Sequence, residues 1–176
     1  MKDKTILKLR PFILSLSLLI FDQLVKAWVV KVIPEGTIFK SFLNDFLWIV
    51  HVRNKGVAFS LGVGASSLMR ILLFIIIPVC LMVFLGWTIL SEKKIFTQGQ
   101  KWFVAGIIGG GLGTIMDRIF RFSSGVVDFI SVNFYGFLGM QRWPTFNISD
   151  SCVVVFSILL VLSMLFTKNA PSDEKK

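Results

Sequence analysis

The stretch GVVDFISVNFYGFLGMQRWPTFNISDS, residues 125–151, separates two strongly apolar segments and carries one aspartate near each end, Asp128 and Asp150. Its aromatic residues, among them Tyr135 and Trp143, are typical of the boundary between a membrane and water. The stretch therefore predicts a loop at a membrane surface, joining two helices that cross the membrane in opposite directions. Such a hairpin brings both aspartates to the same face.

The composition predicts an integral membrane protein. Hydrophobic residues make up 55% of the 176 positions, and the mean hydropathy is +0.78, well above that of a soluble domain. A helix needs about 20 mostly apolar residues to cross the hydrocarbon. The stretches that approach this length are residues 12–32, 68–90, 102–122 and 150–166. We therefore expect one mainly α-helical membrane domain over residues 1–176, with four transmembrane helices and a disordered polar tail at residues 168–176.

Basic residues give the expected orientation. The first span follows Lys2, Lys4, Lys8 and Arg10, as in a secretory signal, but Asp22 and Lys26 interrupt its apolar run and no small-residue cleavage motif follows, so the span is retained. Lys and Arg also gather in the turn after the second span and in the tail, which places both termini in the cytoplasm. Because the basic residues are scattered over separate loops, anionic lipid is a better partner than nucleic acid.

The other outer loop, at about residues 38–62, is predicted to be rich in β-structure. In DFLWIVHVRNKG, apolar residues such as Trp48 and Val50 alternate with their neighbours, and Asn54, Lys55 and Gly56 then supply a turn. A small sheet lying on the membrane would turn its apolar face toward lipid or substrate.

Glycines in the third span predict close helix packing. Gly106 and Gly110, and likewise Gly109 and Gly113, have the small-xxx-small spacing that lets two helices approach each other. A phosphate-binding glycine loop would need a preceding strand and access to water, which this span lacks.

No metal site, disulfide or cofactor is predicted. Cys80 and Cys152 both fall within apolar spans, and the single histidine, His51, has no cysteine cluster near it in the sequence.

Charged residues within the spans are costly and must be paired or functional. Asp22 and Lys26 are four residues apart, with the acid first, which favours a structural ion pair in one helix. Asp117 and Arg118 are adjacent, so they point in different directions and serve different partners; Arg118 could anchor a loop carbonyl or a lipid phosphate. The same four residues could instead form the proton or ion relay of a small transporter. A third hypothesis is a non-catalytic assembly factor whose outer loops bind a partner.

Asp128 and Asp150 favour a different chemistry. Asp150 stands where a helix N-cap is the default role, but Asp128 lies in the apolar run VVDFI, where a lone carboxylate must be protonated or paired. Two carboxylates brought together out of water share a proton, so one can act as a base and the other as an acid. This pair predicts an aspartic protease, which activates water without a metal or a covalent intermediate.

The sequence resembles the lipoprotein signal peptidase (signal peptidase II) family along almost its whole length. Matching motifs occur in order: FDQLVK with Asp22 and Lys26, NKGVAFS with Asn54, Gly56, Ala58 and Phe59, GGGLGTIMDR with Gly113, Asp117 and Arg118, GVVDFI with Asp128, and FNISDS with Asn147 and Asp150. Five ordered motifs together are highly specific. Thr114 and Ser149 depart from the usual pattern, which commonly has Asn and Ala at these positions; both replacements are small and polar.

The resemblance implies a fold, an activity and a set of site residues. It implies four transmembrane helices, a small extracytoplasmic β-cradle and a short interfacial helical segment, in the bacterial inner membrane with the active site at the extracytoplasmic face. It implies cleavage of diacylglyceryl-modified prolipoproteins before the lipidated cysteine, and inhibition by globomycin-type cyclic peptides. With one catalytic bundle per chain, a monomer is expected to suffice for activity. The implied catalytic residues are Asp128 and Asp150, and the supporting residues are Asn54, Gly56, Ala58, Asp117, Arg118 and Asn147. Three apolar residues could either line the substrate groove or be ordinary core or lipid-facing residues: Val57, Phe129 and Phe146.

Overall fold

The computed structural model describes residues 2–56, 66–93 and 95–168. Four membrane-length helical stretches cover Ile6–Val32, Ser67–Leu90, Gln98–Phe120 and Ile148–Thr167, which confirms the four predicted spans. The first contains the end of α1 (Lys2–Leu9) and all of α2 (Pro11–Val32). The second is continuous from α3 (Ser67–Ile71) through the π-helical turn η2 (Leu72–Ile76) into α4 (Ile77–Leu90). The third and fourth are α5 (Gln98–Phe120) and α6 (Ile148–Lys168).

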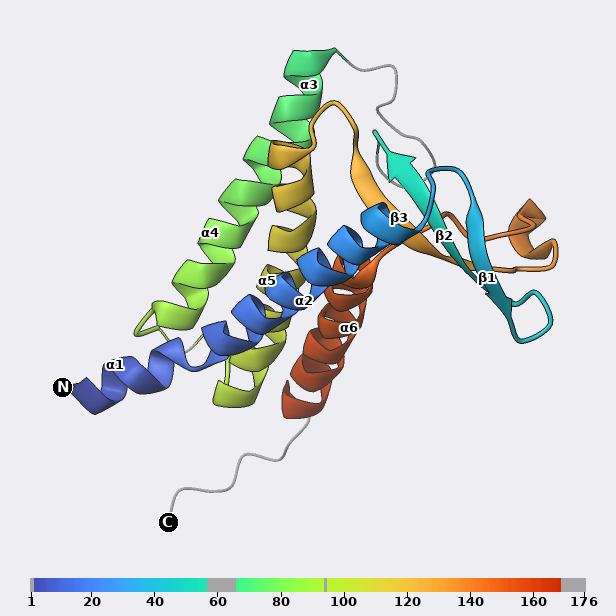
Figure 1. The fold of residues 1–176 in the computed structure, drawn as a ribbon. Helices are drawn as coiled ribbons and strands as arrows, with labels where there is room; N and C mark the ends of the chain where they lie inside the picture. Colours follow the sequence, from blue (N-terminus) through green and yellow to red (C-terminus); the bar gives the residue numbers. More distant parts are fainter. Residues whose placement is uncertain (1, 57–65, 94, 169–176) are drawn as a thin grey trace.

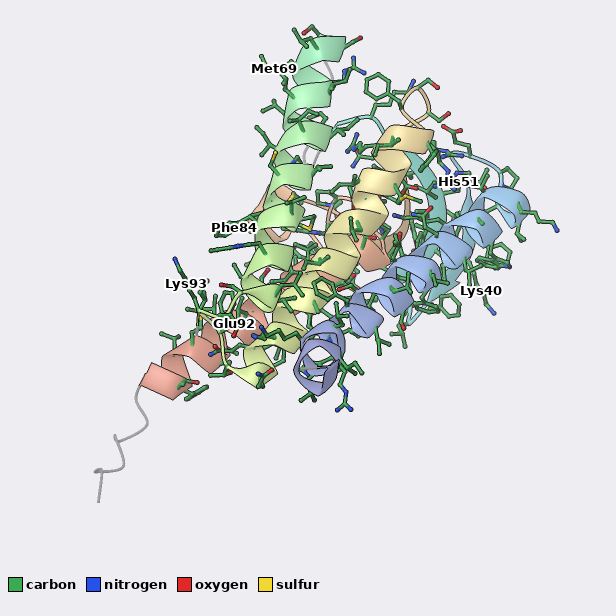
Figure 2. All side chains as sticks on the ribbon, turned by 90° about the vertical axis from the view of Figure 1, so that its left-hand side faces the viewer. Lys40, His51, Met69, Phe84, Glu92 and Lys93 are labelled. Atoms are coloured by element: carbon green, nitrogen blue, oxygen red, sulfur yellow. The ribbon has the colours of Figure 1, made fainter. Side chains whose placement is uncertain are left out.

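Helix α5 is the centre of the bundle. It packs against α2, α4 and α6, and 61% of its most apolar window is buried, against 6% for each of the second and fourth spans (Figure 1). It begins four residues before the predicted start because Thr97 and Gln100 form a capping box. The side chains on the outer surface are apolar, as at Phe84, which points away from the bundle (Figure 2). Hydrocarbon therefore replaces water around most of the structure.

The glycines of α5 make the predicted close contacts. A side chain at Gly106 would collide with the Phe156 ring of α6, and one at Gly109 would come within 2.8 Å of the Ser15 carbonyl oxygen of α2. Ser15 completes this contact by donating a hydrogen bond from its hydroxyl to the Ala105 carbonyl, at 2.6 Å. Small residues therefore allow the backbones to approach, as the spacing predicted.

A three-stranded antiparallel sheet extends from one end of the bundle, in the order β1, β2, β3 (Figure 1). Strands β1 (Ile38–Phe42) and β2 (Leu47–Asn54) confirm the predicted β-rich loop as far as it is described, since residues 57–65 lie outside the described part. Strand β3 (Val126–Val132) was not predicted: the sequence analysis placed Asp128 in a loop. Its first four residues are buried, which explains why its apolar run does not alternate with polar residues.

A bulge shapes the pairing of β2 with β3. Ile49 pairs with Ile130 and Val52 pairs with Asp128, so Val50 and His51 together face one residue, Phe129. Bulges bend a strand and redirect its side chains, and they are frequent beside active sites. Beyond this bulge the end of β2 lies next to the start of β3.

The segment after β3 leaves the sheet and then returns to pair with it. It forms one turn of 3-10 helix, η3 (Phe137–Gly139), which is consistent with the short helical segment that the resemblance implied. It then pairs Phe146 with Ile130 of β3, and α6 begins two residues later, at Ile148. The return path brings the beginning of α6 to the edge of the sheet.

Candidate active site

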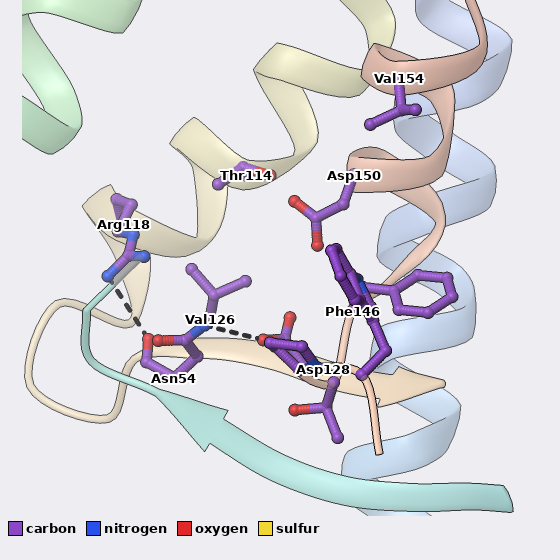
Figure 3. A pocket seen from close by; sticks show the side chains of 11 residues that line it. Asn54, Thr114, Arg118, Val126, Asp128, Phe146, Asp150 and Val154 are labelled. Carbon is purple, nitrogen blue, oxygen red and sulfur yellow. Dashed lines mark hydrogen bonds between the residues drawn. The ribbon is translucent and has the colours of Figure 1, made fainter. Parts of the chain in front are cut away.

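A cavity of about 270 Å³ lies where α5, α6 and the sheet meet (Figure 3). It is lined by residues of β2, α5, β3, the returning segment and α6: Asn54, Thr114, Arg118, Val126, Asp128, Trp143, Pro144, Thr145, Phe146, Asp150 and Val154. The two aspartates predicted to form a catalytic pair therefore share one cavity, although they are 22 positions apart in the sequence.

Asp128 is held by two side-chain amides. It is 1% exposed, and its Oδ2 accepts a hydrogen bond from Asn54 Nδ2 at 3.0 Å while its Oδ1 accepts one from Asn147 Nδ2 at 2.7 Å. Burial, followed by the negative charge of Asp150, raises the pKa of Asp128 to about 7, against the lowering effect of the two amides. At neutral pH this carboxyl group is therefore close to the midpoint of its titration.

Asp150 is fixed by the first turn of α6. Its Oδ2 accepts a hydrogen bond from the Asn147 backbone N–H at 3.1 Å, and Asn147 Oδ1 accepts one from the Asp150 backbone N–H at 3.0 Å. This reciprocal pair is a capping box with Asn147 as the N-cap, so the default N-cap role considered for Asp150 belongs to Asn147. The helix starts at Ile148, which makes Asp150 its third residue.

Asn147 links the two carboxyl groups, since its fully buried side chain contacts the Asp128 carboxylate and the backbone of Asp150. Asn54 has two roles as well. Its Nδ2 holds Asp128, and its Oδ1 accepts a hydrogen bond from the Gly56 N–H at 3.0 Å, so it also forms the predicted turn.

Arg118 supports this turn from α5. Its guanidinium donates hydrogen bonds to the carbonyl oxygens of Asn54 and Gly56 and lies 5.0 Å from the centre of the Phe74 ring. The expectation that Arg118 anchors a loop carbonyl is confirmed. Because its hydrogen bonds go to backbone oxygens, Arg118 fixes the position of Asn54.

Asp117 faces a different cluster. Lys26 Nζ lies 2.7 Å from Asp22 Oδ2 and 2.8 Å from Asp117 Oδ2, and Arg121 pairs with the other oxygen of Asp117. The predicted Asp22–Lys26 pair and the separate partners of Asp117 and Arg118 are therefore confirmed. Asp117 does not line the cavity.

Some contacts of this cluster escaped the sequence analysis. Asp22 Oδ1 accepts a hydrogen bond from the Ser149 backbone N–H at 3.0 Å, which ties the ionic cluster to the turn that carries Asp150. Arg121 was also missed, although its spacing of four from Asp117 on one helix was a usable signal. The cavity wall formed by Trp143, Pro144 and Thr145 had no local signal, because it depends on the path of the returning segment.

Of the residues expected to line a groove, Phe146 lines the cavity, but Phe129 does not. Phe129 is 5% exposed and packs in a core cluster with Val29, Ile33 and Val127, so it takes the alternative role of a core residue. Burial against α2 stabilises the sheet on the bundle instead. Val57, Ala58 and Phe59 lie outside the described residues.

The arrangement can perform acid–base chemistry on a molecule in the cavity. Two carboxyl groups in a largely desolvated space do not ionise independently, so one retains a proton over a range in which the other is charged. A water molecule or a substrate carbonyl between them would meet a base and an acid together.

Comparison with known proteins gives the family. The sequence profile described as Signal peptidase (SPase) II matches residues 14–166. The lipoprotein signal peptidase of Borrelia hermsii (strain HS1 / DAH) is 44% identical over 156 residues, 89% of each chain. That of Borrelia turicatae (strain 91E135) is 44% identical over 162 residues, 92% of this chain and 93% of the other.

Solved structures share the fold. A bacterial membrane enzyme superposes with a TM-score of 0.75 and 24% sequence identity over 95% of this chain and 94% of its own. A second bacterial membrane enzyme superposes with a TM-score of 0.71 and 24% sequence identity over 89% of this chain and 92% of its own. Together with the sequence relatives, these matches show that the chain belongs to the signal peptidase II family and is a multi-pass bacterial membrane protease.

Proposed function

We propose that the protein is an aspartic endopeptidase that removes signal peptides from diacylglyceryl-modified prolipoproteins by cleaving immediately before the lipidated cysteine. The observation that carries the proposal is the placement of Asp128 and Asp150 in one cavity, with Asn147 bonded to both. The curated relatives are named lipoprotein signal peptidases, which supports the substrate class. Family membership also favours proteolysis over the transporter and the assembly factor.

In the proposed reaction the pair of aspartates shares one proton. The ionised carboxylate takes a proton from a water molecule as the water oxygen attacks the scissile carbonyl carbon. The protonated partner donates its proton to the carbonyl oxygen, which gives a neutral tetrahedral intermediate. Breaking the C–N bond then requires a proton on the leaving nitrogen, which the first carboxyl group returns. As the carbonyl re-forms, the partner carboxylate takes a proton from a hydroxyl of the intermediate, so the pair again shares one proton.

The remaining site residues hold this pair in place. Asn54 and Asn147 orient the Asp128 carboxylate, and Arg118 fixes the Asn54 turn through the carbonyl oxygens of Asn54 and Gly56. Asp117 acts from a distance, through Lys26 and Asp22, on the first turn of α6. Ala58 is assigned to substrate support on the resemblance alone.

The position of the site suits a lipid-anchored substrate. The cavity lies at one end of the bundle, where the sheet joins α5 and α6, while α6 ends at the opposite end (Figure 1). With both termini in the cytoplasm, the aspartates lie at the extracytoplasmic face of the inner membrane, where acyl chains can stay in hydrocarbon while the peptide meets water. One bundle holds every proposed residue, so a monomer suffices, and globomycin-type cyclic peptides are the expected inhibitors.

Cleavage of a defined precursor tests the proposal. Purified protein in detergent micelles is incubated with a diacylglyceryl-modified precursor, and Asp128→Asn and Asp150→Asn are each compared with wild type. Loss of the acid–base pair is expected to lower the rate about 10³-fold in each variant. Asp45→Asn is the matched control, because Asp45 lies in the turn between β1 and β2 and is exposed. Wild-type rates in both dyad variants would refute the assignment.

A further inference from the structure

Arg142 lies on the returning segment, immediately before one wall of the catalytic cavity. The three residues that follow it, Trp143, Pro144 and Thr145, all line the cavity and are called the cavity wall below. The segment comes back from η3 toward the sheet, where Arg142 pairs with Asn133. The position of the cavity wall therefore depends on what holds this segment to the sheet.

The guanidinium of Arg142 bonds to two parts of the sheet. Its Nε donates a hydrogen bond to Ser131 Oγ at 2.8 Å, and its Nη2 donates one to the Ser131 carbonyl oxygen at 2.9 Å. Its Nη1 donates to the Asp45 carbonyl oxygen at 3.0 Å, and Nη2 also reaches the Phe46 carbonyl oxygen at 3.4 Å. Arg142 therefore ties the returning segment both to β3 and to the turn between β1 and β2.

The same guanidinium stacks on Trp48 of β2, with its Cζ 3.6 Å from the centre of the ring. A planar guanidinium can lie on an aromatic face while it donates hydrogen bonds from its edge, which an ammonium group cannot do. The contacts of Arg142 with Asp45 and Phe46 use only their backbone carbonyls, so they do not depend on the side chains of those two residues. We call this set of contacts the arginine clasp.

The turn held by the clasp is strained. Leu43, Asn44 and Asp45 are consecutive residues with φ of 52°, 53° and 68°, in the left-handed region that is unfavourable for residues with a side chain. Such a conformation persists only where the surrounding structure over-determines it. The hydrogen bonds from Arg142 to this turn contribute to that restraint, so the turn and the returning segment support each other.

Arg142 acts on the cavity without entering it. It does not line the cavity, and three of its guanidinium nitrogens already donate to oxygens of the protein. Within the cavity wall, Pro144 has no N–H with which to bond to the sheet. The wall is therefore held from its two ends, by Arg142 before it and by Phe146, which pairs with Ile130, after it.

We propose that Arg142 is a positioning residue for substrate binding, which fixes the cavity wall as a rigid surface for the peptide beside the scissile bond. The inference rests on the proposed function, in which that bond is cleaved at the dyad in the same cavity. Without the clasp, the wall is free to take other positions, and binding must then order it at a cost in entropy. The dyad keeps its own supports, Asn54 and Asn147, so the bound substrate is still cleaved.

The separation of KM from kcat tests the inference. Arg142→Met should raise the KM for a diacylglyceryl-modified precursor about tenfold, because substrate must order the wall, while kcat stays within about twofold of wild type. Gln141→Met is the matched control. Gln141 is the exposed neighbour on the same segment, and the hydrogen bond from the Phe134 N–H to its backbone oxygen is kept, so its KM should equal that of wild type.

Two further variants separate the clasp from simple charge. Arg142→Lys keeps the positive charge but loses the planar fork, so its KM should remain about fivefold above wild type. Trp48→Leu removes the stacking surface and should raise KM about threefold. The double variant Arg142→Met/Trp48→Leu should raise KM by less than the product of the single effects, because both residues act through one contact. Full rescue by lysine, or purely multiplicative effects, would overturn the inference.

The two proposals fail differently. If the wild-type protein does not cleave the precursor before the lipidated cysteine, the proposed function is wrong and the inference falls with it. If the wild-type protein cleaves, but Arg142→Met retains the wild-type KM or loses kcat at an unchanged KM, the proposed function stands and Arg142 does not position the wall for substrate.

Discussion

Two clusters of carboxylates lie in the described part of the protein, and they differ in what surrounds them. In the ionic cluster, formed by Asp22, Lys26, Asp117 and Arg121, each acid lies against a cation. In the dyad of Asp128 and Asp150, the direct hydrogen-bond donors are amides, and the nearest cation on the cavity wall, Arg118, gives its hydrogen bonds to backbone oxygens.

This difference separates a structural role of the ionic cluster from the proposed catalytic role of the dyad. Carboxylates paired with buried cations hold helices together, and removal of the cation leaves an unpaired charge. The carboxyl group of Asp128, which is held by neutral amides and buried near Asp150, has a pKa raised to about 7, so it exchanges a proton near neutral pH. The same residue type therefore fastens α2 to α5 in one place and, in the proposed reaction, activates water in the other.

The strongest test of the contrast is removal of the cation from the ionic cluster. Lys26→Met leaves Asp22 and Asp117 buried without their shared partner, and it should destabilise the protein by about 3–5 kcal/mol. Thermal unfolding in detergent measures the effect, with Lys40→Met, an exposed position on β1, as the control. An unchanged melting temperature in Lys26→Met would show that the cluster does not stabilise the bundle.

Asn147→Ala removes an amide from the dyad instead. It should lower activity about 100-fold, because Asp128 and the first turn of α6 lose their common support. Stability should fall by about 0.5–2 kcal/mol, the usual cost of an N-cap. Asn147→Ser can keep the cap while losing the amide, so it should recover stability without recovering the rate. Recovery of both would mean that Asn147 acts only as a cap.

The smallest effect is expected at Arg121, which is partly exposed at the edge of the ionic cluster. Arg121→Gln should cost about 1 kcal/mol of stability, since an ion pair open to solvent contributes little. The kcat of the peptidase should stay close to that of wild type. A loss as large as that of Lys26→Met would show that Arg121 is an equal member of the cluster.

The bundle could be predicted because each span is long and apolar enough to be recognised locally. The close contacts of Gly106 and Gly109 were also predictable, since helical spacing fixes which residues share a face. Strand β3 was missed because its partner is β2, more than 70 positions earlier, and its buried run resembles an apolar linker.

In the site, the pairing of Asp128 with Asp150 was predicted from topology and from the resemblance to a family. The spacing of Asn147 and Asp150 is that of a capping box, but the sequence analysis considered Asp150, and not Asn147, as the N-cap. The bulge at Val50 and His51 and the cavity wall at Trp143 depend on tertiary pairing, so no local pattern indicated them.

Infrared difference spectroscopy of the carboxyl groups tests most directly whether the dyad shares a proton. The spectrum of the Asp128→Asn variant is subtracted from that of the wild-type protein. At pH 6 the difference spectrum should show the carbonyl band of a protonated carboxylic acid, and this band should disappear as the pH rises through about 7. In Asp150→Asn the band should vanish at lower pH, because the neighbouring negative charge that raises the pKa of Asp128 is gone. Absence of the band in the wild-type protein at every pH above 5 would show that both carboxyl groups are ionised, and it would contradict the shared proton.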